Sequence, residues 1–229
     1  MSQDDADIPD DLEGALEAMP LFPLKQAVLF PGALLPLHVF EPRYRKLVAD
    51  VLASHRTMSV PQVLERPEGE GDDEGGDPAR PPIARVAGVG TIIEHAELPG
   101  GRFNIVLLGR GRVALDELPF APPYRRATAK LLRTTRDDDV PPLELTALHA
   151  AVHAFAKLVR EKDSDFELRL PKGPPSLIVD ACAHHLVLDA RQRQEALETL
   201  DVVDRVRRVT EVLTIQRAAL SPTTSSGLN

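Results

Sequence analysis

The sequence predicts an α+β protein in which a half rich in β-strands precedes a helical half. Up to about residue 135, short apolar runs end at proline or glycine, as strands bounded by turns do. After a break at Asp137–Asp139 and Pro141-Pro142, apolar residues recur every three to four positions, which is the helical period. An apolar content of 43% in 229 residues supplies a core for one large or two modest domains.

The first elements of the β half are short. Leu21–Leu24 and Ala27–Phe30 are apolar runs interrupted or ended by proline, and Pro31-Gly32 indicates a turn. The run Leu34–Phe40 contains Pro36, which cannot donate to a ladder and so places this strand at an edge or a bulge. Four later strands are expected at residues 58–64, 83–94, 102–115 and 124–133, with a Leu-Pro-Gly-Gly hairpin loop at 98–101.

The strand expected at 102–115 is apolar on both faces. Phe103, Ile105 and Leu107 alternate with Asn104, Val106 and Leu108, so the strand is predicted to be covered on two sides. Gly109 and Gly111 favour a β-bulge, which we place at a sheet edge with Arg110 and Arg112 solvated.

One helix interrupts the strands. Tyr44, Leu47, Val48, Val51 and Leu52 form a single apolar stripe, and Pro42 suits the first helical position because its missing N–H would be unpaired there. The negative charge of Glu41 favours the positive end of the helix dipole, and Arg45, one turn on, is expected to pair with it.

The helical half is expected to contain helices at 143–160 and 176–187 and one or two more within 191–215. Ser176 follows the Pro-Lys-Gly-Pro-Pro loop and is predicted to be an N-cap. The expected domains are therefore a β subdomain at 21–136 and a helical subdomain at 137–218.

The acidic residues are concentrated in two segments. Residues 1–20 and 65–80 hold seven acidic residues each, and we expect a disordered acidic tail and a flexible acidic loop there, with a second tail at 219–229. The whole chain carries −8, whereas the remainder without the two acidic segments carries about +4. That charge is well below the basic stripe of a dedicated nucleic-acid binder.

Several motifs in order carry a resemblance to a known family. They are LFPL, VLFPG, LPLHVFEPRYRKLV, GVGTI and RFNIVLLGRGRVAL, within residues 21–115. Together they resemble the N-terminal substrate-binding domain of Lon proteases, in its stand-alone bacterial form without ATPase and peptidase domains, over residues 21–215. The resemblance implies a PUA-like six-stranded pseudobarrel with one inserted helix, followed by a C-terminal α-helical bundle. It also implies capture of unfolded or exposed hydrophobic polypeptide segments, with a separate Lon protease as a second candidate partner.

The residues of the first long motif support two interpretations. A strand that enters a helix at Glu41-Pro42 explains the segment by structure alone. Alternatively, Phe40, Arg43 and Tyr44 line a recognition groove, since Tyr and Arg give binding energy at low ordering cost. We take Phe40, Arg43, Tyr44, Arg110 and Arg112 as the candidate peptide-binding residues.

Catalytic and metal chemistry is not predicted. Ser176 echoes the serine of Lon-type peptidases, but no lysine follows Lys172 to serve as its base, and no P-loop motif occurs. His149 and His153 are one turn apart without a third ligand, and the single Cys182 predicts a buried thiol. No catalytic residue, metal or cofactor is expected.

The sequence therefore predicts a non-enzymatic polypeptide-recognition module, acting as an adaptor or sensor in protein quality control. The alternative is an RNA-binding PUA-like module that uses Arg102, Arg110, Arg112, Arg125 and Arg126. Against that alternative, few aromatic residues are available for base stacking. The acidic N-terminus lacks the basic region of a signal peptide and no apolar stretch approaches 20 residues, so a soluble cytoplasmic protein with no membrane partner is expected.

Overall fold

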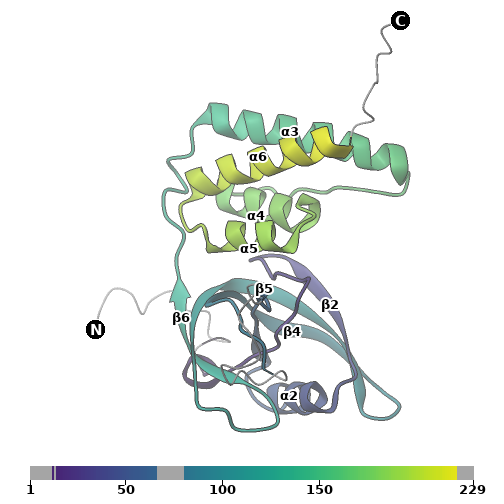
Figure 1. The fold of residues 1–229 in the computed structure, drawn as a ribbon, viewed down its shortest axis with the longest axis vertical. Helices are drawn as coiled ribbons and strands as arrows, with labels where there is room; N and C mark the ends of the chain where they lie inside the picture. The colour runs from purple at the N-terminus through teal and green to yellow at the C-terminus, as the bar shows by residue number, and fades with distance from the viewer. Residues whose placement is uncertain (1–11, 13, 66–79, 221–229) are drawn as a thin grey trace, which may run out of the picture. The chain divides into compact units, whose positions relative to one another are not determined.

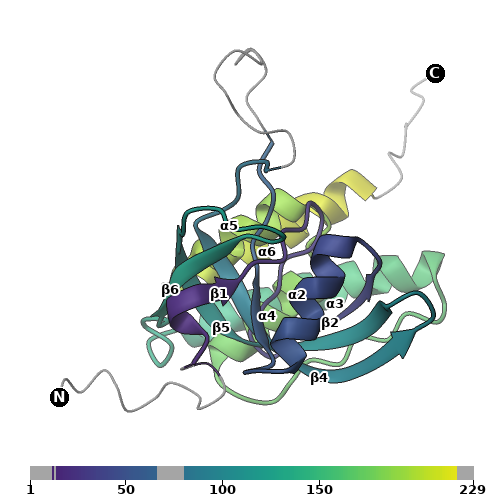
Figure 2. The same ribbon diagram turned by 90° about the horizontal axis from the view of Figure 1, so that it is seen from below.

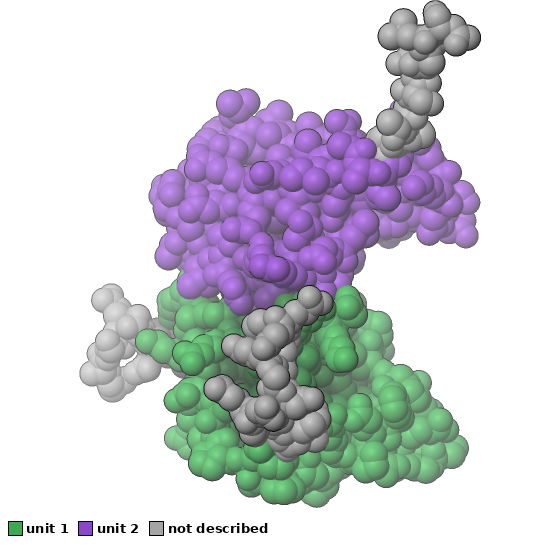
Figure 3. All heavy atoms as spheres, viewed as in Figure 1, with its two compact units in different colours: residues 1–133 green, residues 134–229 purple. Residues whose placement is uncertain are grey.

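The computed structural model describes residues 12, 14–65 and 80–220. The chain divides into two compact units, residues 1–133 and 134–229, which Figure 3 distinguishes by colour. The sequence placed the boundary between residues 136 and 137. Most of the predicted acidic loop at 65–80 and all but the first two residues of the predicted tail at 219–229 lie outside the described residues.

Unit 1 is built on one antiparallel six-stranded sheet that curls into a barrel-like shape (Figure 1). In sheet order the strands are β1 (Met19–Pro20), β6 (Arg126–Leu132), β5 (Arg102–Glu117), β4 (Val86–Leu98) and β3 (Thr57–Val60), and β2 (Leu34–Val39) pairs with β5. The α+β prediction is confirmed. The hairpin predicted at residues 98–101 is present, with Gly100 and Gly101 in the left-handed region at φ of 81° and 68°.

Strand β5 is the centre of this sheet, because it pairs with β2, β4 and β6. Phe103, Ile105 and Leu107 are buried on one face, as their alternation predicted. The predicted bulge is present, with Arg110 as the extra residue between the pairs Gly109–Gly90 and Gly111–Val89. Its predicted position at a sheet edge is wrong.

Glycines at and beside the bulge leave room for the backbone of Leu29 and Phe30 to lie directly against the sheet. A Cβ atom on Gly88 would lie 1.9 Å from the carbonyl oxygen of Leu29, and one on Gly109 would lie 1.9 Å from that of Phe30. The N–H of Gly109 donates to the Ala33 carbonyl over 2.8 Å, and the N–H of Gly32 donates back to the Gly109 carbonyl over 2.9 Å. The run Ala27–Phe30, expected as a strand, instead crosses the sheet here in irregular conformation.

Helix α2 (Pro42–Leu52) covers one end of the sheet, as Figures 1 and 2 show. Pro42 is in its first turn, and Leu47, Val48 and Val51 pack into the core with Phe103 and other buried residues of the strands. The predicted pairing of Glu41 with Arg45 is wrong. Glu41 accepts a 3.0 Å hydrogen bond from Nε of Arg43, while Arg45 donates to the Gly100 carbonyl in the β4–β5 loop.

The predicted disordered tail at residues 1–20 is wrong at its C-terminal end. Residues Leu16–Ala18 form the 3-10 helix η2, and Met19–Pro20 forms β1 against β6. Leu12, Ala15 and Met19 are almost fully buried in a second core cluster with Val89 and Val113. The prediction of disorder relied on the high charge of the segment and overlooked that Leu12, Ala15 and Met19 recur at helical spacing.

Within residues 134–220, the described part of unit 2, the helices are α3 (Pro142–Lys162), α4 (Pro175–Leu186), α5 (Ala190–Glu198) and α6 (Val202–Leu220). Each lies within a few residues of its predicted range. Cys182 is fully buried, as predicted, and burial raises the pKa of its thiol to about 12.

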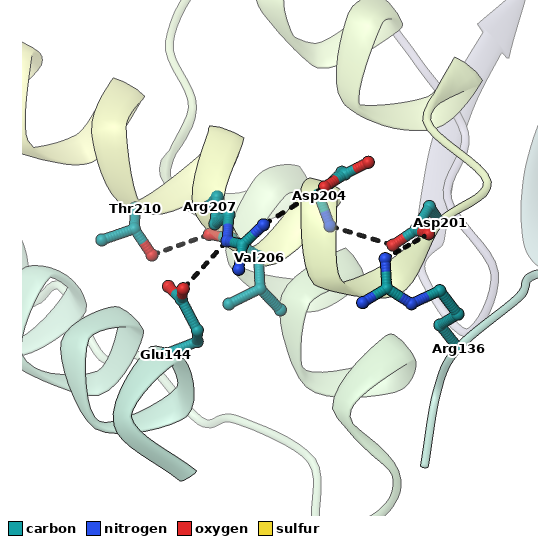
Figure 4. A network of polar contacts seen from close by, with 7 residues as sticks. All are labelled: Arg136, Glu144, Asp201, Asp204, Val206, Arg207 and Thr210. Atoms are coloured by element: carbon teal, nitrogen blue, oxygen red, sulfur yellow. Dashed lines mark hydrogen bonds and ion pairs between the residues drawn. The ribbon is translucent and has the colours of Figure 1, made fainter. Parts of the chain in front are cut away.

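Two carboxylates fix helix ends in unit 2. Helix α4 has Pro174 as its N-cap, so Ser176 lies in its first turn and the predicted N-cap position of Ser176 is wrong. Asp137 accepts hydrogen bonds from both the backbone N–H and the hydroxyl of Ser176. Asp201 similarly accepts from the N–H of Asp204 over 3.1 Å at the start of α6 and pairs with Arg136 (Figure 4). Arg207, one turn on, joins Asp204 to Glu144 of α3.

Candidate functional site

Two adjoining hollows in unit 1 form the candidate site, which we call the groove. The first, of about 320 Å³, lies where β2 ends and α2 begins. The second, of about 220 Å³, lies beside the loop before β6. Both are lined by Pro23, Arg43, Tyr44 and Arg125, so these four residues lie between the two hollows.

The wall between the hollows is a stack of side chains. The Tyr44 ring lies 4.4 Å from the Phe22 ring between centroids, and the guanidinium carbon of Arg43 lies 4.5 Å from the Tyr44 centroid. Burial raises the pKa of the Tyr44 hydroxyl above its ordinary value, more than the nearby Arg43 charge lowers it. This hydroxyl is therefore neutral at pH 7 and able to donate a hydrogen bond.

Phe40 is the exposed phenylalanine of the first hollow. It follows the last residue of β2 and retains 61% of its accessible surface, whereas Phe22 in the same hollow retains 5%. The only described ring neighbour of Phe40 is His38, 6.1 Å away between centroids. Isolated exposed apolar residues are common, but Phe40 adjoins a hollow whose other walls include Leu24 and Leu37.

Polar contacts fix the positions of the side chains that line the second hollow. Arg125 forms a two-pronged pair with Glu117 of β5 and donates to the Pro81 carbonyl over 2.7 Å. Arg80 lies over the Phe120 ring at 4.7 Å. The Tyr124 hydroxyl donates to Asp50 of α2 over 2.9 Å, which connects this loop to the helix below the groove.

The structure brings together three of the five predicted residues. Phe40, Arg43 and Tyr44 all line the groove. Arg110 is exposed at the bulge, where its Nε donates to Thr91, and lines neither hollow. Arg112 is only 2% exposed, with its guanidinium carbon 6.0 Å from the Phe30 ring centre, which contradicts the prediction that it is solvated.

Sequence reasoning missed several residues of the groove. It interpreted the segments of Phe22, Lys25 and Phe120 only as a strand or a connection, and it named Arg125 only for the RNA-binding alternative. The LFPL motif was noticed as part of the resemblance, and its proline-interrupted apolar pattern next to Lys25 was the available signal. Nothing in the sequence showed that Phe120 lies near Tyr44, because the two are far apart along the chain.

Other chemistry receives no support within the described ranges. No group of three His, Cys, Asp or Glu side chains among residues 12, 14–65 and 80–220 is placed to hold a metal ion. In the same residues no helix is both long and apolar enough to cross a membrane. The hydroxyl of Ser176 is engaged by Asp137, without a described lysine partner.

Comparison with known proteins gives a consistent result. Residues 18–214 match the model of the ATP-dependent protease La (Lon) substrate-binding domain. The chain is 31% identical over 225 residues to a Lon protease of Roseiflexus castenholzii, covering 96% of this chain and 26% of that protein. It is 30% identical over 207 residues to Lon protease 2 of Syntrophobacter fumaroxidans, covering 89% of this chain and 25% of that protein. The chain thus spans about a quarter of the length of these relatives.

Solved structures agree in fold. The N-terminal domain of a Mycobacterium avium complex Lon protease superposes with a TM-score of 0.61 at 16% identity, covering 86% of this chain and 98% of that one. A Lon N-terminal domain protein from Xanthomonas campestris gives a TM-score of 0.61 at 22% identity, covering 85% and 97%.

Proposed function

This chain belongs to the family of Lon substrate-binding domains, and from that premise we propose that it is a non-catalytic module that binds exposed apolar segments of unfolded polypeptides through the groove. One observation supports this proposal most strongly. Phe40, Arg43 and Tyr44, which the sequence predicted to bind peptide, line the same hollow as two further apolar side chains, Phe22 and Leu24.

The physical character of the groove supports a polypeptide ligand. Its two hollows, about 320 and 220 Å³, lie at or below the lower end of the range typical of small-molecule pockets, which suits single side chains. Tyr, Phe and Arg give large contact areas with few rotatable bonds, so they bind diverse segments at low ordering cost. Affinity for one short segment is expected to be weak, with Kd of about 10 µM to 1 mM, because ordering a flexible chain offsets much of the contact energy.

In the cell, we propose that this binding serves protein quality control, as an adaptor or sensor, and that a separate Lon protease is a candidate recipient of the captured polypeptide. Family membership and the substrate-binding description of the matched model support this role. The proposal that the module has no peptidase activity of its own is supported by Ser176, whose hydroxyl donates to Asp137 and has no lysine partner among the described residues.

The experiment is a titration of the protein with a tryptophan-free and tyrosine-free apolar peptide, followed by tyrosine fluorescence. The chain has two tyrosines and no tryptophan, and both Tyr44 and Tyr124 line the groove, so a bound segment changes the emission directly. Casein contains tryptophan and tyrosine, so binding of unfolded casein is measured in parallel by the anisotropy of fluorescein-labelled casein.

The matched variants are Phe40→Ser and Leu143→Ser, which each remove one exposed apolar side chain, 61% and 79% exposed, from different units. Phe40→Ser is expected to weaken binding about fivefold to thirtyfold, whereas Leu143→Ser leaves it unchanged. Equal affinities for the two variants, or no binding by the unaltered protein at millimolar peptide, would remove the support for the groove.

A further inference from the structure

Basic side chains line the groove beside its apolar residues. Lys25 and Arg43 line the first hollow, Arg80 lines the second, and Arg125 lies between them. Among the described lining residues the single acid is Glu41, which pairs with Arg43. The described lining therefore combines apolar and aromatic side chains with an excess of positive charge.

One of these cations is open to direct contact with a carboxylate. Lys25 is exposed and has no ion-pair partner among the described residues. Arg43 pairs with Glu41 over 2.9 Å and has further interactions, but its side chain is 42% exposed, so its positive charge still acts on a bound segment at the wall between the hollows. Arg125 also lines both hollows, but its pair with Glu117 compensates most of its charge.

The order of these features along the groove matches an extended chain. Alternate side chains of an extended segment project to the same side, so residues i, i+2 and i+4 face one surface together. A hollow, a cationic wall at Arg43 and a second hollow then fit an apolar, an acidic and an apolar side chain in that order.

On these grounds we infer that the groove selects segments in which a carboxylate lies between two apolar side chains at alternate positions. This inference rests on the proposed function and adds to it a substrate class: acidic–apolar segments bind more tightly than neutral or basic segments of the same apolar content.

The test uses three fluorescein-labelled peptides of equal length built on Phe-Ser-X-Ser-Leu in a Gly/Ser context, where X is Asp, Asn or Lys. Binding is followed by fluorescence anisotropy at low and at physiological salt. The Asp peptide is expected to bind about threefold to tenfold more tightly than the Asn peptide, and the Lys peptide to bind most weakly. The advantage of Asp should shrink as salt rises, because the contacting charges are exposed.

Variants locate the charge effect. Lys25→Glu is expected to remove or invert the preference for Asp, and Lys130→Glu, the same charge change at an exposed position of β6 outside the groove, should preserve it. Equal affinity for all three peptides would overturn the inference and leave polypeptide binding intact. A preference for Asp that both lysine variants reduce equally would also overturn it, since the effect would then come from net charge. Failure of all three peptides together with failure of unfolded casein would overturn the proposed function as well.

Discussion

At the scale of single residues, the glycines of the GVGTI and LLGRGRVAL motifs have a steric explanation. Gly88 and Gly109 lie on neighbouring strands directly beneath the backbone of Leu29 and Phe30, and neither leaves room for a Cβ atom. The sequence predicted the bulge from the two glycines of GRG, but the reason for Gly109 lies in a segment 80 residues earlier, which local patterns do not reveal.

Gly109→Ala is predicted to lower the free energy of unfolding of unit 1 by roughly 2 kcal/mol or more, because the new methyl group meets a backbone oxygen that cannot rotate away. Gly111→Ala is the control: its Cβ would lie 3.6 Å from the nearest atom, in the Leu131 side chain, so stability should be unchanged or slightly raised. Urea unfolding followed by tyrosine fluorescence measures this, since both tyrosines belong to unit 1. Equal losses for both variants would contradict the steric explanation.

Cys182 gives a second prediction at this scale. Burial raises the pKa of its thiol to about 12, so at pH 8 the folded protein holds it as the unreactive thiol. We expect almost no reaction with a disulfide reagent in the native state and one thiol per chain after unfolding. Rapid reaction of the folded protein would show that α4 opens readily.

The raised pKa of the Cys182 thiol makes the free energy of unfolding depend on pH. An unfolded cysteine ionises near pH 8.5, so between that pH and about 12 the unfolded chain has lost a proton that the folded chain retains. The free energy of unfolding therefore falls as pH rises above about 9. Cys182→Ala should reduce this alkaline slope, and an unchanged slope would assign it to other groups.

At the scale of elements, the helices were predicted more accurately than the irregular connections. Period and proline breaks placed α2, α3 and α4 within a few residues, because helices depend on local spacing. The elements η2 and β1 were not predicted, because the high negative charge of residues 1–20 was interpreted as a sign of disorder. Leu12, Ala15 and Met19 are nevertheless spaced to form a buried apolar stripe. Ser176 was predicted to be an N-cap, but its N–H and hydroxyl bind the carboxylate of Asp137, 39 residues earlier. Glu41 pairs with Arg43 and not with Arg45, one turn on.

Helices α4 and α6 are joined by an ion pair that sequence patterns do not show. Arg205 and Asp180 are 3.1 Å apart, 0% and 2% exposed at their side chains, and Arg205 also donates to the Thr199 carbonyl. A charge at this depth is tolerated only with its partner, because desolvation is costly.

Asp180→Ala is predicted to destabilise unit 2 by about 3–5 kcal/mol, since it leaves the buried Arg205 uncompensated. The double variant Asp180→Leu with Arg205→Met should recover most of that loss. Glu144→Gln, which weakens the exposed contact to Arg207, should hardly move the unfolding midpoint. Far-UV circular dichroism during urea unfolding distinguishes these outcomes; a double variant as unstable as Asp180→Ala would contradict the explanation by desolvation.

At the scale of the whole molecule, the sequence identified the fold and one side of the groove. Phe40, Arg43 and Tyr44 belong to one contiguous motif at the strand-to-helix junction, so they could be proposed together. The opposite side could not, because Phe22, Phe120 and Arg125 join it only when the sheet closes. Arg110 and Arg112 were added for their chemistry alone, and closure of the sheet placed both outside the two hollows.

We propose that a bound polypeptide lies in the groove of unit 1, and a photo-cross-linking map tests this proposal. An apolar peptide with a photoreactive phenylalanine analogue is irradiated with the full chain, and the attachment sites are identified by mass spectrometry. The predicted attachment sites lie within residues 21–25, 37–44 and 120–125, and they should be lost on competition with unfolded casein. Attachment confined to residues 134–220, or spread evenly over both units, would show that the groove is not the binding site.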